Sequence, residues 1–332
     1  MHSPNSQQEK SLMSRGELLT LLDTAMLCGA FRYARQISLT WLAYYPGDLA
    51  VRFKYGQLLL KTDREKQAVQ HRTELCQADP EYLEAWYLLA SALKGKSIST
   101  AASDKAFMIA DCQSAIYALD GEIIPSAPLP AWANSVLQSR HALARGEIER
   151  AEEHLHQVLV VDPLPALVAV THLYLMRASE LPTAAVQNLA DFYHQRFPTT
   201  IAPVMFLAEA LMDSGEPERA VSLLHQSATM DVTNQVSNRI WQGQTPYIDL
   251  WPGTLEAPVN IPIPAEVAAQ FGWNRLPQEA TESMYFAEVQ SQSNPGQVQP
   301  AARTRKSNKF PASPAVIPLG EPDQRISAAV KA

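Results

Sequence analysis

Residues 83–90 read Leu83-Glu84-Ala85-Trp86-Tyr87-Leu88-Leu89-Ala90. From Trp86 the apolar positions recur at i, i+3, i+4 and i+7, the spacing of one face of an amphipathic helix. The same spacing begins at Leu18 and at Tyr55, and short polar or glycine-containing breaks such as Gly146-Glu147 separate these stretches. The sequence therefore predicts a series of helices, and the short breaks between them favour antiparallel neighbours.

A period of 34 residues organises the predicted helices. Pro46 and Pro80 are 34 residues apart, and so are Ala34 and Ala68. Each alanine precedes its proline by 12 residues, and this spacing recurs once more from Ala151. Small residues are expected where helices approach closely, and proline ends a helix because it has no N–H to donate. One helix pair cannot bury its apolar stripe alone, so the pairs are expected to stack.

These features resemble the tetratricopeptide repeat family. Leu83–Ala90 matches the opening of one repeat, and Gly56 takes the corresponding small position in the repeat before it. Arg145–Glu152 and Ser214–Ala220 look like the turn and the start of the second helix. The resemblance implies an all-α fold, an α-solenoid of about six antiparallel helix pairs. The six repeats fall at residues 15–48, 49–82, 83–120, 132–165, 166–199 and 201–234.

The expected domain organisation has four parts. Residues 1–14 are expected to be a disordered N-terminus, and residues 15–244 a helical repeat domain with an irregular connector near 121–131. Residues 245–277 are rich in proline and aromatic residues, and we expect them to form a short helix over 265–271 and to pack on the solenoid. Residues 278–332 contain too little apolar surface to fold and are expected to be a disordered tail.

Composition and charge disfavour several classes of function. Apolar residues make up 46% of the chain, enough for a sizeable core, and the net charge of −7 disfavours nucleic-acid binding by the folded domain. Cys28, Cys76 and Cys112 lack the spacing of a zinc site or a disulfide framework. Neither a signal peptide nor an apolar run of about 20 residues is present. We therefore expect a cytoplasmic protein that does not associate with membranes.

The search for catalytic chemistry gives no candidate. The sequence contains no GxGxxG, GxxxxGK[ST], GxSxG or HExxH motif. Glu152 and His156 share a helix face, but no second ligand pair has matching spacing, so we interpret this face as solvated. Glu209 and Asp213 are interpreted as acidic lining of the repeat stack. The prediction is a protein that is not an enzyme, with no catalytic residue, metal or cofactor.

The resemblance also implies a binding groove. In this family, the inward face of each pair's first helix usually takes a partner peptide. Aromatic residues, methionine and a few charges suit such capture. The alternative is that terminal segments of the chain cover part of the groove. Carried onto this chain, the repeat phase gives the groove residues Leu19, Asp23, Phe53, Gln57, Lys61, Tyr87, Ser91, Lys94, Arg140, Tyr174, Arg177, Met205 and Glu209.

The leading functional hypothesis is a non-enzymatic scaffold that binds another protein or a peptide segment in this groove. The alternative is an accessory or regulatory subunit of an enzyme or signalling assembly, with residues 245–277 as an intramolecular cap or docking element. A basic cluster in the tail is interpreted as solubilising: Arg303, Arg305, Lys306 and Lys309. The partner's identity and the oligomeric state remain open at this stage.

Overall fold

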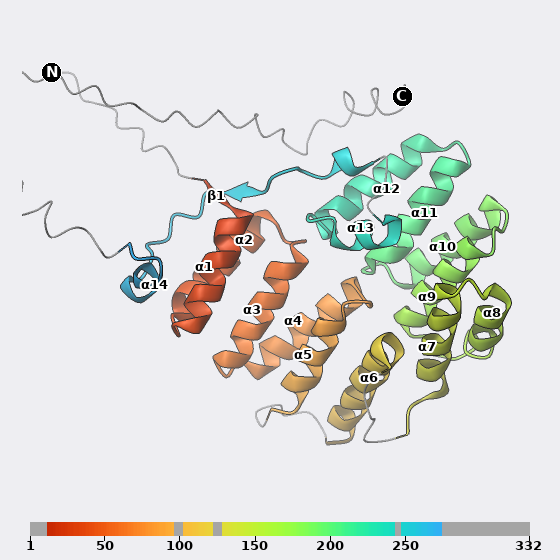
Figure 1. The fold of residues 1–332 in the computed structure, drawn as a ribbon, viewed down its shortest axis with the longest axis horizontal. Coiled ribbons are helices and arrows are strands. Elements are labelled where there is room, and N and C mark those ends of the chain that lie inside the picture. Colours follow the sequence, from red (N-terminus) through yellow and green to blue (C-terminus); the bar gives the residue numbers. More distant parts are fainter. Residues whose placement is uncertain (1–11, 96–101, 122–127, 243–246, 274–332) are drawn as a thin grey trace, which may run out of the picture.

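The computed structural model describes residues 12–95, 102–121, 128–242 and 247–273, and this part of the chain is almost entirely helical (Figure 1). Within these ranges, two-residue strands β1 (Met13–Ser14) and β2 (Glu256–Ala257) form one antiparallel pair. The helices follow in chain order as α1 (Arg15–Leu27), α2 (Phe31–Tyr44), α3 (Leu49–Lys61), α4 (Glu65–Ala78), α5 (Leu83–Leu93), α6 (Ala102–Asp120), α7 (Ala131–Ala144), α8 (Ile148–His156), α9 (Ala166–Ala178), α10 (Thr183–Arg196), α11 (Ile201–Asp213), α12 (Pro217–Met230), α13 (Gln235–Trp241), the 3₁₀ turn η1 (Ile248–Leu250) and α14 (Ala265–Gln270).

Helices α1 to α12 pack consecutively against one another. The expected all-α fold is confirmed, and the consecutive packing is consistent with an α-solenoid. The six expected repeats coincide with the helix pairs α1–α2, α3–α4, α5–α6, α7–α8, α9–α10 and α11–α12. The helical spacing in the sequence therefore locates these elements well.

The turns inside the helix pairs have a common backbone conformation. Gly146, after α7, has a φ of 71°, and Gly215, after α11, has a φ of 81°. Glycine adopts this left-handed conformation without the steric cost that a Cβ would add. Asp63 takes a similar φ of 55° in the α3–α4 turn, where aspartate is one of the few tolerated alternatives. These single residues let each chain segment turn sharply into the next helix.

The small positions of the sequence pattern lie at close helix contacts. Ala34, Ala68 and Ala151 are fully buried, as expected. Gly56 has a more specific role, because a Cβ there would come 3.2 Å from Nε of Arg72. The fully buried Arg72 guanidinium donates to the Gly56 carbonyl oxygen at 2.6 Å and to the Leu88 carbonyl oxygen, so it links α3, α4 and α5. Burial lowers the pKa of Arg72 to about 10.

The part of the sequence with the weakest repeat pattern, near 95–131, is described incompletely. Helix α6 is continuous over Ala102–Asp120 and is longer than its neighbours. Most of the predicted connector near 121–131 lies outside the described residues, and so do residues 1–11 of the predicted disordered N-terminus, 1–14, and the whole predicted tail, 278–332. The predictions for those segments stay predictions.

The stack curls until its C-terminal helices contact turns near its beginning (Figure 1). Gly47, in the α2–α3 turn, lies so close to the Thr229 carbonyl oxygen at the end of α12 that a side chain would collide with it. The Thr200 hydroxyl donates to the Gln77 carbonyl oxygen at 2.7 Å, which joins the start of α11 to the end of α4. One edge of the early helix pairs is therefore covered by the chain itself.

Residues 247–273 return from the end of the stack to its beginning. The Trp251 indole N–H donates to the Asp231 carbonyl oxygen at 2.7 Å, and the Arg15 N–H donates to the Leu255 carbonyl oxygen at 3.0 Å. Leu255 and Val267 are buried in the same apolar cluster as the core side chains of α1 and α2. This segment thus covers α1, which would otherwise expose its apolar side at the end of the stack.

Asp48 holds the first three helices together. Its fully buried carboxylate caps α3 by accepting from the Val51 N–H at 3.2 Å. It also accepts from Nε of Arg15 at 2.7 Å and from the Trp41 indole N–H at 3.1 Å. One side chain therefore satisfies a helix end, a charge from α1 and a buried donor from α2.

We predict that Asp48→Ala lowers the free energy of unfolding by about 3 kcal/mol, because it leaves a half-buried guanidinium and a buried indole N–H unpaired. Asp23→Ala is the matched control, since the Asp23–Lys54 pair is exposed and its loss costs less than about 1 kcal/mol. Urea denaturation followed by circular dichroism measures both. Equal midpoints for the two variants would contradict the assignment.

Candidate functional site

The structure separates the predicted groove residues into two groups. Those on α1, α3 and α5 lie on what we call the first-helix face: Leu19, Asp23, Phe53, Gln57, Lys61, Tyr87, Ser91 and Lys94. Those on α7, α9 and α11 form the second group: Arg140, Tyr174, Arg177, Met205 and Glu209. The two groups differ in what covers them.

Helix α13 lies against the second group. The Ile240 carbonyl oxygen accepts from Arg177 at 3.1 Å, and the Trp241 indole N–H donates to Glu209 at 3.3 Å. Met205 is fully buried and accepts a hydrogen bond from the Ser237 hydroxyl at 3.1 Å. The placement of Met205 in an accessible groove is therefore wrong, because α13 occupies the position that a partner would take.

A cluster of buried charges fixes α13 in this place. Glu81, in the α4–α5 turn, accepts from Arg140 at 2.7 Å, from the Tyr174 hydroxyl at 3.2 Å and from Nε of Arg239 at 3.2 Å. Arg239, on α13, also binds both carboxylate oxygens of the fully buried Asp79, at 3.0 and 2.6 Å. Two carboxylates and two guanidiniums thus join α13, α7 and the α4–α5 turn.

The pKa values of this cluster follow from burial and pairing. Burial alone would raise the pKa of Glu81, but Arg140 and Arg239 together hold it below its usual value. For Asp79, burial outweighs the attraction of Arg239, so its pKa is raised. Burial would lower the pKa of Arg239, but the two carboxylates outweigh it and raise the pKa further. Every charge has an opposite partner, which identifies a structural network.

The first-helix face is open by comparison. Tyr87 keeps 45% of its surface exposed, although its hydroxyl donates to Asp120 at 3.3 Å. Phe53 stacks on Tyr82 with 5.4 Å between ring centroids and is half-buried. Lys61 and Lys94 are exposed and form no ion pair with any described residue. Here, then, an aromatic ring and two unneutralised ammonium groups are accessible.

The other residues of this face are less prominent. Asp23 and Lys54 form an ion pair between α1 and α3, so their charges are compensated. Ser91 is exposed, while Leu19 and Gln57 are half-buried. The first-helix face is therefore a mixed surface whose uncompensated charge comes from the two lysines.

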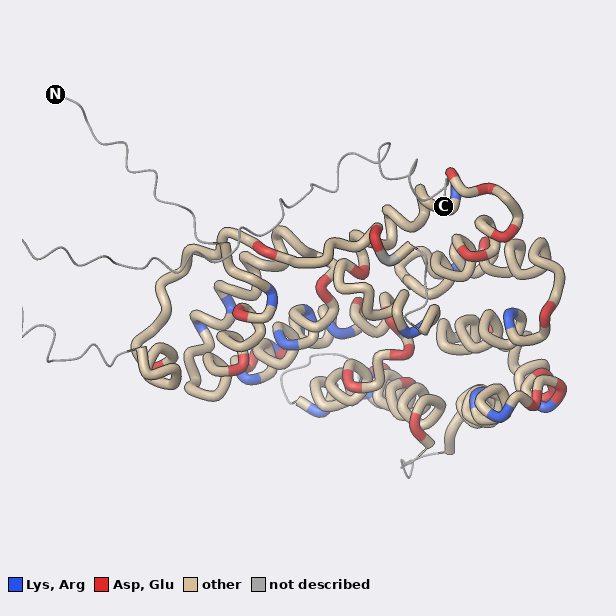
Figure 2. The backbone as a smooth tube through the Cα atoms, turned by 45° about the horizontal axis from the view of Figure 1, so that its top comes forward, with Lys and Arg blue, Asp and Glu red and all other residues tan. Residues whose placement is uncertain are grey.

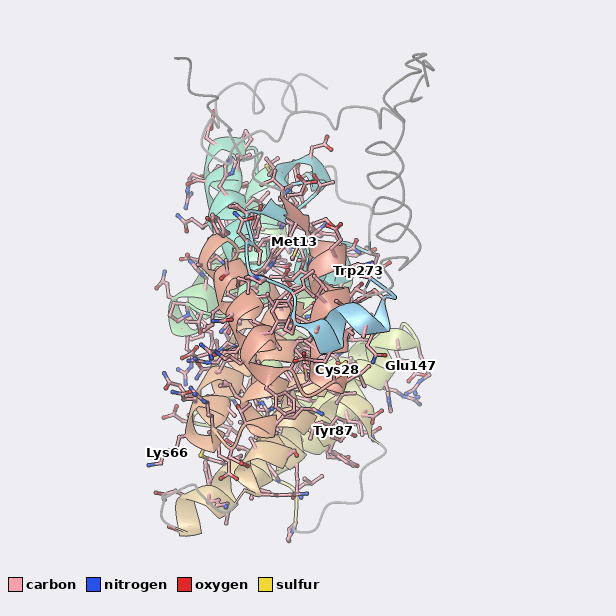
Figure 3. The ribbon with its side chains drawn as sticks, turned by 90° about the vertical axis from the view of Figure 1, so that its left-hand side faces the viewer. Met13, Cys28, Lys66, Tyr87, Glu147 and Trp273 are labelled. Atoms are coloured by element: carbon pink, nitrogen blue, oxygen red, sulfur yellow. The ribbon has the colours of Figure 1, made fainter. Side chains whose placement is uncertain are left out.

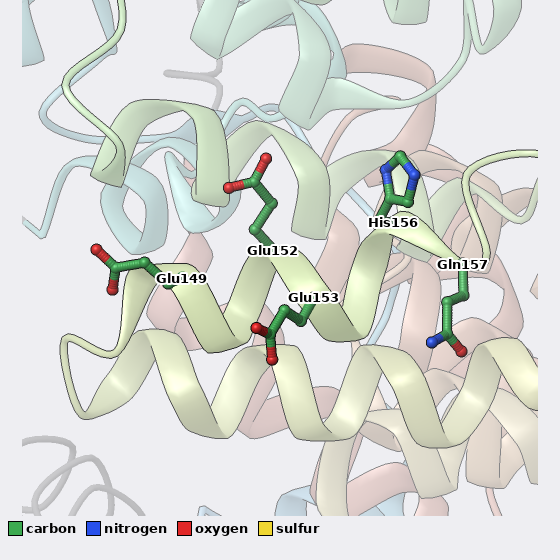
Figure 4. A pocket seen from close by; sticks show the side chains of 5 residues that line it. All are labelled: Glu149, Glu152, Glu153, His156 and Gln157. Atoms are coloured by element: carbon green, nitrogen blue, oxygen red, sulfur yellow. The ribbon is translucent and has the colours of Figure 1, made fainter.

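Glutamates with one histidine line a shallow, open pocket on α8 (Figure 4). Glu149, Glu152, Glu153 and His156 come from successive turns of one exposed helix face, and Figure 4 shows their side chains pointing apart. Within the described ranges, no three histidine, cysteine, aspartate or glutamate side chains gather closely enough to hold a metal ion. The arrangement therefore offers no chemistry beyond its negative charge.

A half-buried histidine, His172, lies between α9 and α10. Nδ1 of His172 is 2.8 Å from the Tyr193 hydroxyl, and burial lowers the pKa of His172 to about 4. The imidazole is therefore neutral at physiological pH. Its contact with Tyr193 bridges α9 and α10.

Comparison with known proteins does not add a function. A scan against protein-family models finds no matching family, and a search of curated proteins finds no matching relative. Across the described residues, no helix combines the length and the apolar character needed to cross a membrane.

We predict that Arg239→Met lowers the free energy of unfolding by about 3 kcal/mol, because two buried carboxylates lose a shared cation. Arg219→Met is the matched control, since Arg219 pairs with Glu216 at an exposed position and its loss costs less than about 1 kcal/mol. Urea denaturation measures the stability, and hydrogen exchange at α13 reports whether this helix detaches. A native-like α13 in Arg239→Met would contradict the proposed anchoring.

We also predict a pH dependence that originates at His172. Its folded-state pKa of about 4 lies below the ordinary value of 6.5, so the unfolded chain binds more protons in this window. Stability from this site is complete above pH 6.5 and decreases as the pH falls towards 4. Urea midpoints measured across this range should fall less steeply for His172→Gln than for the exposed His141→Gln control. Parallel curves would rule out the assignment.

Proposed function

We propose that this chain is a non-enzymatic scaffold that binds a segment of another protein along the first-helix face. The observation that carries the proposal is that exposed Tyr87 and Ser91 on α5 follow Phe53 and Gln57 on α3 by one 34-residue period, with exposed lysines at the ends of both helices, Lys61 and Lys94. A surface repeated along consecutive helices suits an extended partner, which contacts each repeat in turn.

We also infer that the helix pairs are of the tetratricopeptide type and run antiparallel. The support is the 34-residue spacing of Ala34 and Ala68, together with three-residue breaks at residues 28–30, 62–64, 145–147 and 214–216. Connections of three residues between packed helices favour an antiparallel arrangement of the two helices. This arrangement places α1, α3 and α5 side by side.

The chemistry of the face suggests the kind of segment it holds. An exposed tyrosine supplies a large contact area at a low entropic cost, and the ammonium groups of Lys61 and Lys94 attract carboxylates. The proposed site is shorter than the groove predicted from the sequence, because α13 occupies the part formed by α7, α9 and α11. The proposed partner therefore engages three helix pairs rather than six.

An alternative role is that of an accessory subunit in a larger assembly, located in the cytoplasm. Residues 247–273 favour this alternative, because they wrap the outside of α1 and end in the exposed Trp273. In that role the wrapped segment is a docking element presented to a neighbouring subunit.

Site-specific photo-cross-linking tests the main proposal. A photoreactive residue replaces Ser91, on the first-helix face, or the exposed Ser222, on α12, as the matched control. We expect a discrete adduct in host extract only from position 91, reduced by about 10-fold when Tyr87→Glu is added, because a buried aromatic contact is worth about 1–2 kcal/mol. The same adduct from both positions, or none from position 91, would remove the proposal.

A further inference from the structure

The closure of the stack covers one edge of the early helix pairs and leaves the other free. The α2–α3 and α4–α5 turns contact α12 and α13, as Gly47 and Asp79 show. The opposite edge consists of the α1–α2 and α3–α4 turns and the end of α5, at the bottom left of Figure 1. Among the described residues, those of α12 and α13 form no hydrogen bond or ion pair with this edge, whereas α14 contacts it through the hydrogen bond from Cys28 to Glu266.

This free edge is basic. Five exposed cations gather there, and none forms an ion pair with a described residue: Arg32, Lys61, Arg64, Lys66 and Lys94, which together we call the basic edge. Arg32 and Lys66 occupy equivalent positions of consecutive repeats, 34 residues apart. In Figure 3, Lys66 projects from the opposite side of the stack to Tyr87, so the basic edge extends from the first-helix face to the outer surface.

The charge at this edge is only partly balanced locally. The five exposed cations compare with three exposed carboxylates, Asp63, Asp104 and Glu266, and with the half-buried Glu65. No acidic residue occurs between Asp23 and Asp48. In the left half of Figure 2, Lys and Arg (blue) are interspersed with Asp and Glu (red). In a chain with a net charge of −7, five unpaired cations on one edge repel one another and attract an acidic occupant.

The described chain ends beside this edge. Helix α14 contacts α1, and the Cys28 thiol donates to the Glu266 carbonyl oxygen at 3.7 Å, next to the α1–α2 turn. Phe271 packs against the same buried cluster as Phe31, the first residue of α2. Helix α14 therefore lies beside the α1–α2 turn, and the described residues end three positions after it.

The sequence that follows carries the complementary charge. Residues 279–288 read Glu279-Ala280-Thr281-Glu282-Ser283-Met284-Tyr285-Phe286-Ala287-Glu288, and no lysine or arginine occurs between Arg275 and Arg303. These residues lie outside the described part of the chain. From Trp273, the six residues to Glu279 span at most about 20 Å.

We propose that residues 279–288 dock on the basic edge of their own chain. Glu279, Glu282 and Glu288 neutralise the cations, and Tyr285 and Phe286 supply apolar contact area. Because Lys61 and Lys94 belong to both surfaces, the docked segment competes with a partner on the first-helix face. Binding of an acidic partner then requires release of this segment, and salt favours release.

Limited proteolysis of the full-length chain tests this inference. Chymotrypsin cleaves after Tyr285 and Phe286, and the cleavage rate follows the fraction of time for which the segment is undocked. We expect cleavage at these residues to increase by about 5-fold in the triple variant Lys61→Glu, Arg64→Glu, Lys66→Glu, and by a similar factor in 0.5 M salt. The control replaces three exposed arginines near the starts of α8 and α12 with glutamate instead: Arg145, Arg150 and Arg219. This control variant should be cleaved at the same rate as the wild type.

A charge exchange decides between docking and an unfolding artefact. Adding Glu279→Lys, Glu282→Lys and Glu288→Lys to the edge variant restores the opposite charges and should restore slow cleavage. Equal cleavage rates in the wild type and the edge variant, or no rescue by the exchange, would overturn the inference. Protection that increases with protein concentration would overturn it too, since docking would then occur between chains. A missing adduct at position 91 would remove the proposed partner and leave these cleavage results unaffected, so the two failures can be told apart.

Discussion

The two-pronged contact of Arg239 with Asp79, supported by Glu81, sets the shape on which the rest of the molecule depends. In a stack of helix pairs each pair contacts only its neighbours, so these local contacts do not determine how far the stack curves. The contact between Arg239 and Asp79 joins residues 160 positions apart. It fixes the position at which α13 packs against the α4–α5 turn. A buried ion pair adds little net stability, because desolvating the two charges offsets their attraction. It nevertheless favours one geometry, because a buried charge without its partner costs about 3–5 kcal/mol. The network therefore specifies one closure rather than adding much stability.

That closure determines which surfaces remain for binding. It places α13 against Arg177 and Glu209 and over the buried Met205, so the part of the expected groove formed by α9 and α11 is partly covered. It also covers one edge of the early helix pairs and leaves the opposite edge exposed. The first-helix face and the basic edge are thus consequences of one contact.

The sequence predicts the local structure well and the closure hardly at all. Ala34, Ala68 and the breaks at glycine recur at regular spacing in the sequence, because equivalent helix contacts in each repeat need the same small residues. The contact of Arg239 with Asp79 and Glu81 cannot be predicted in this way. A single arginine on a helix forms no periodic pattern, and its partners lie in a turn four repeats earlier. Met205 fits the repeat phase of an accessible position, and only the fold of α13 buries it. Thus periodicity predicts which side chains share a face, while contacts between distant repeats decide whether that face is open.

The net charge of the chain likewise differs from the charge of its individual surfaces. The net charge of −7 describes the chain as a whole, yet three of its acidic groups, Asp48, Asp79 and Glu81, are buried and neutralised by arginines from other helices. These buried carboxylates and their arginines neutralise one another, so the surface field of α1 to α5 depends on the exposed, unpaired cations of the basic edge. An average over the sequence cannot reveal this, because it counts buried and exposed charges alike. The partner chemistry of this protein is therefore better inferred from the unpaired cations of one edge than from its composition.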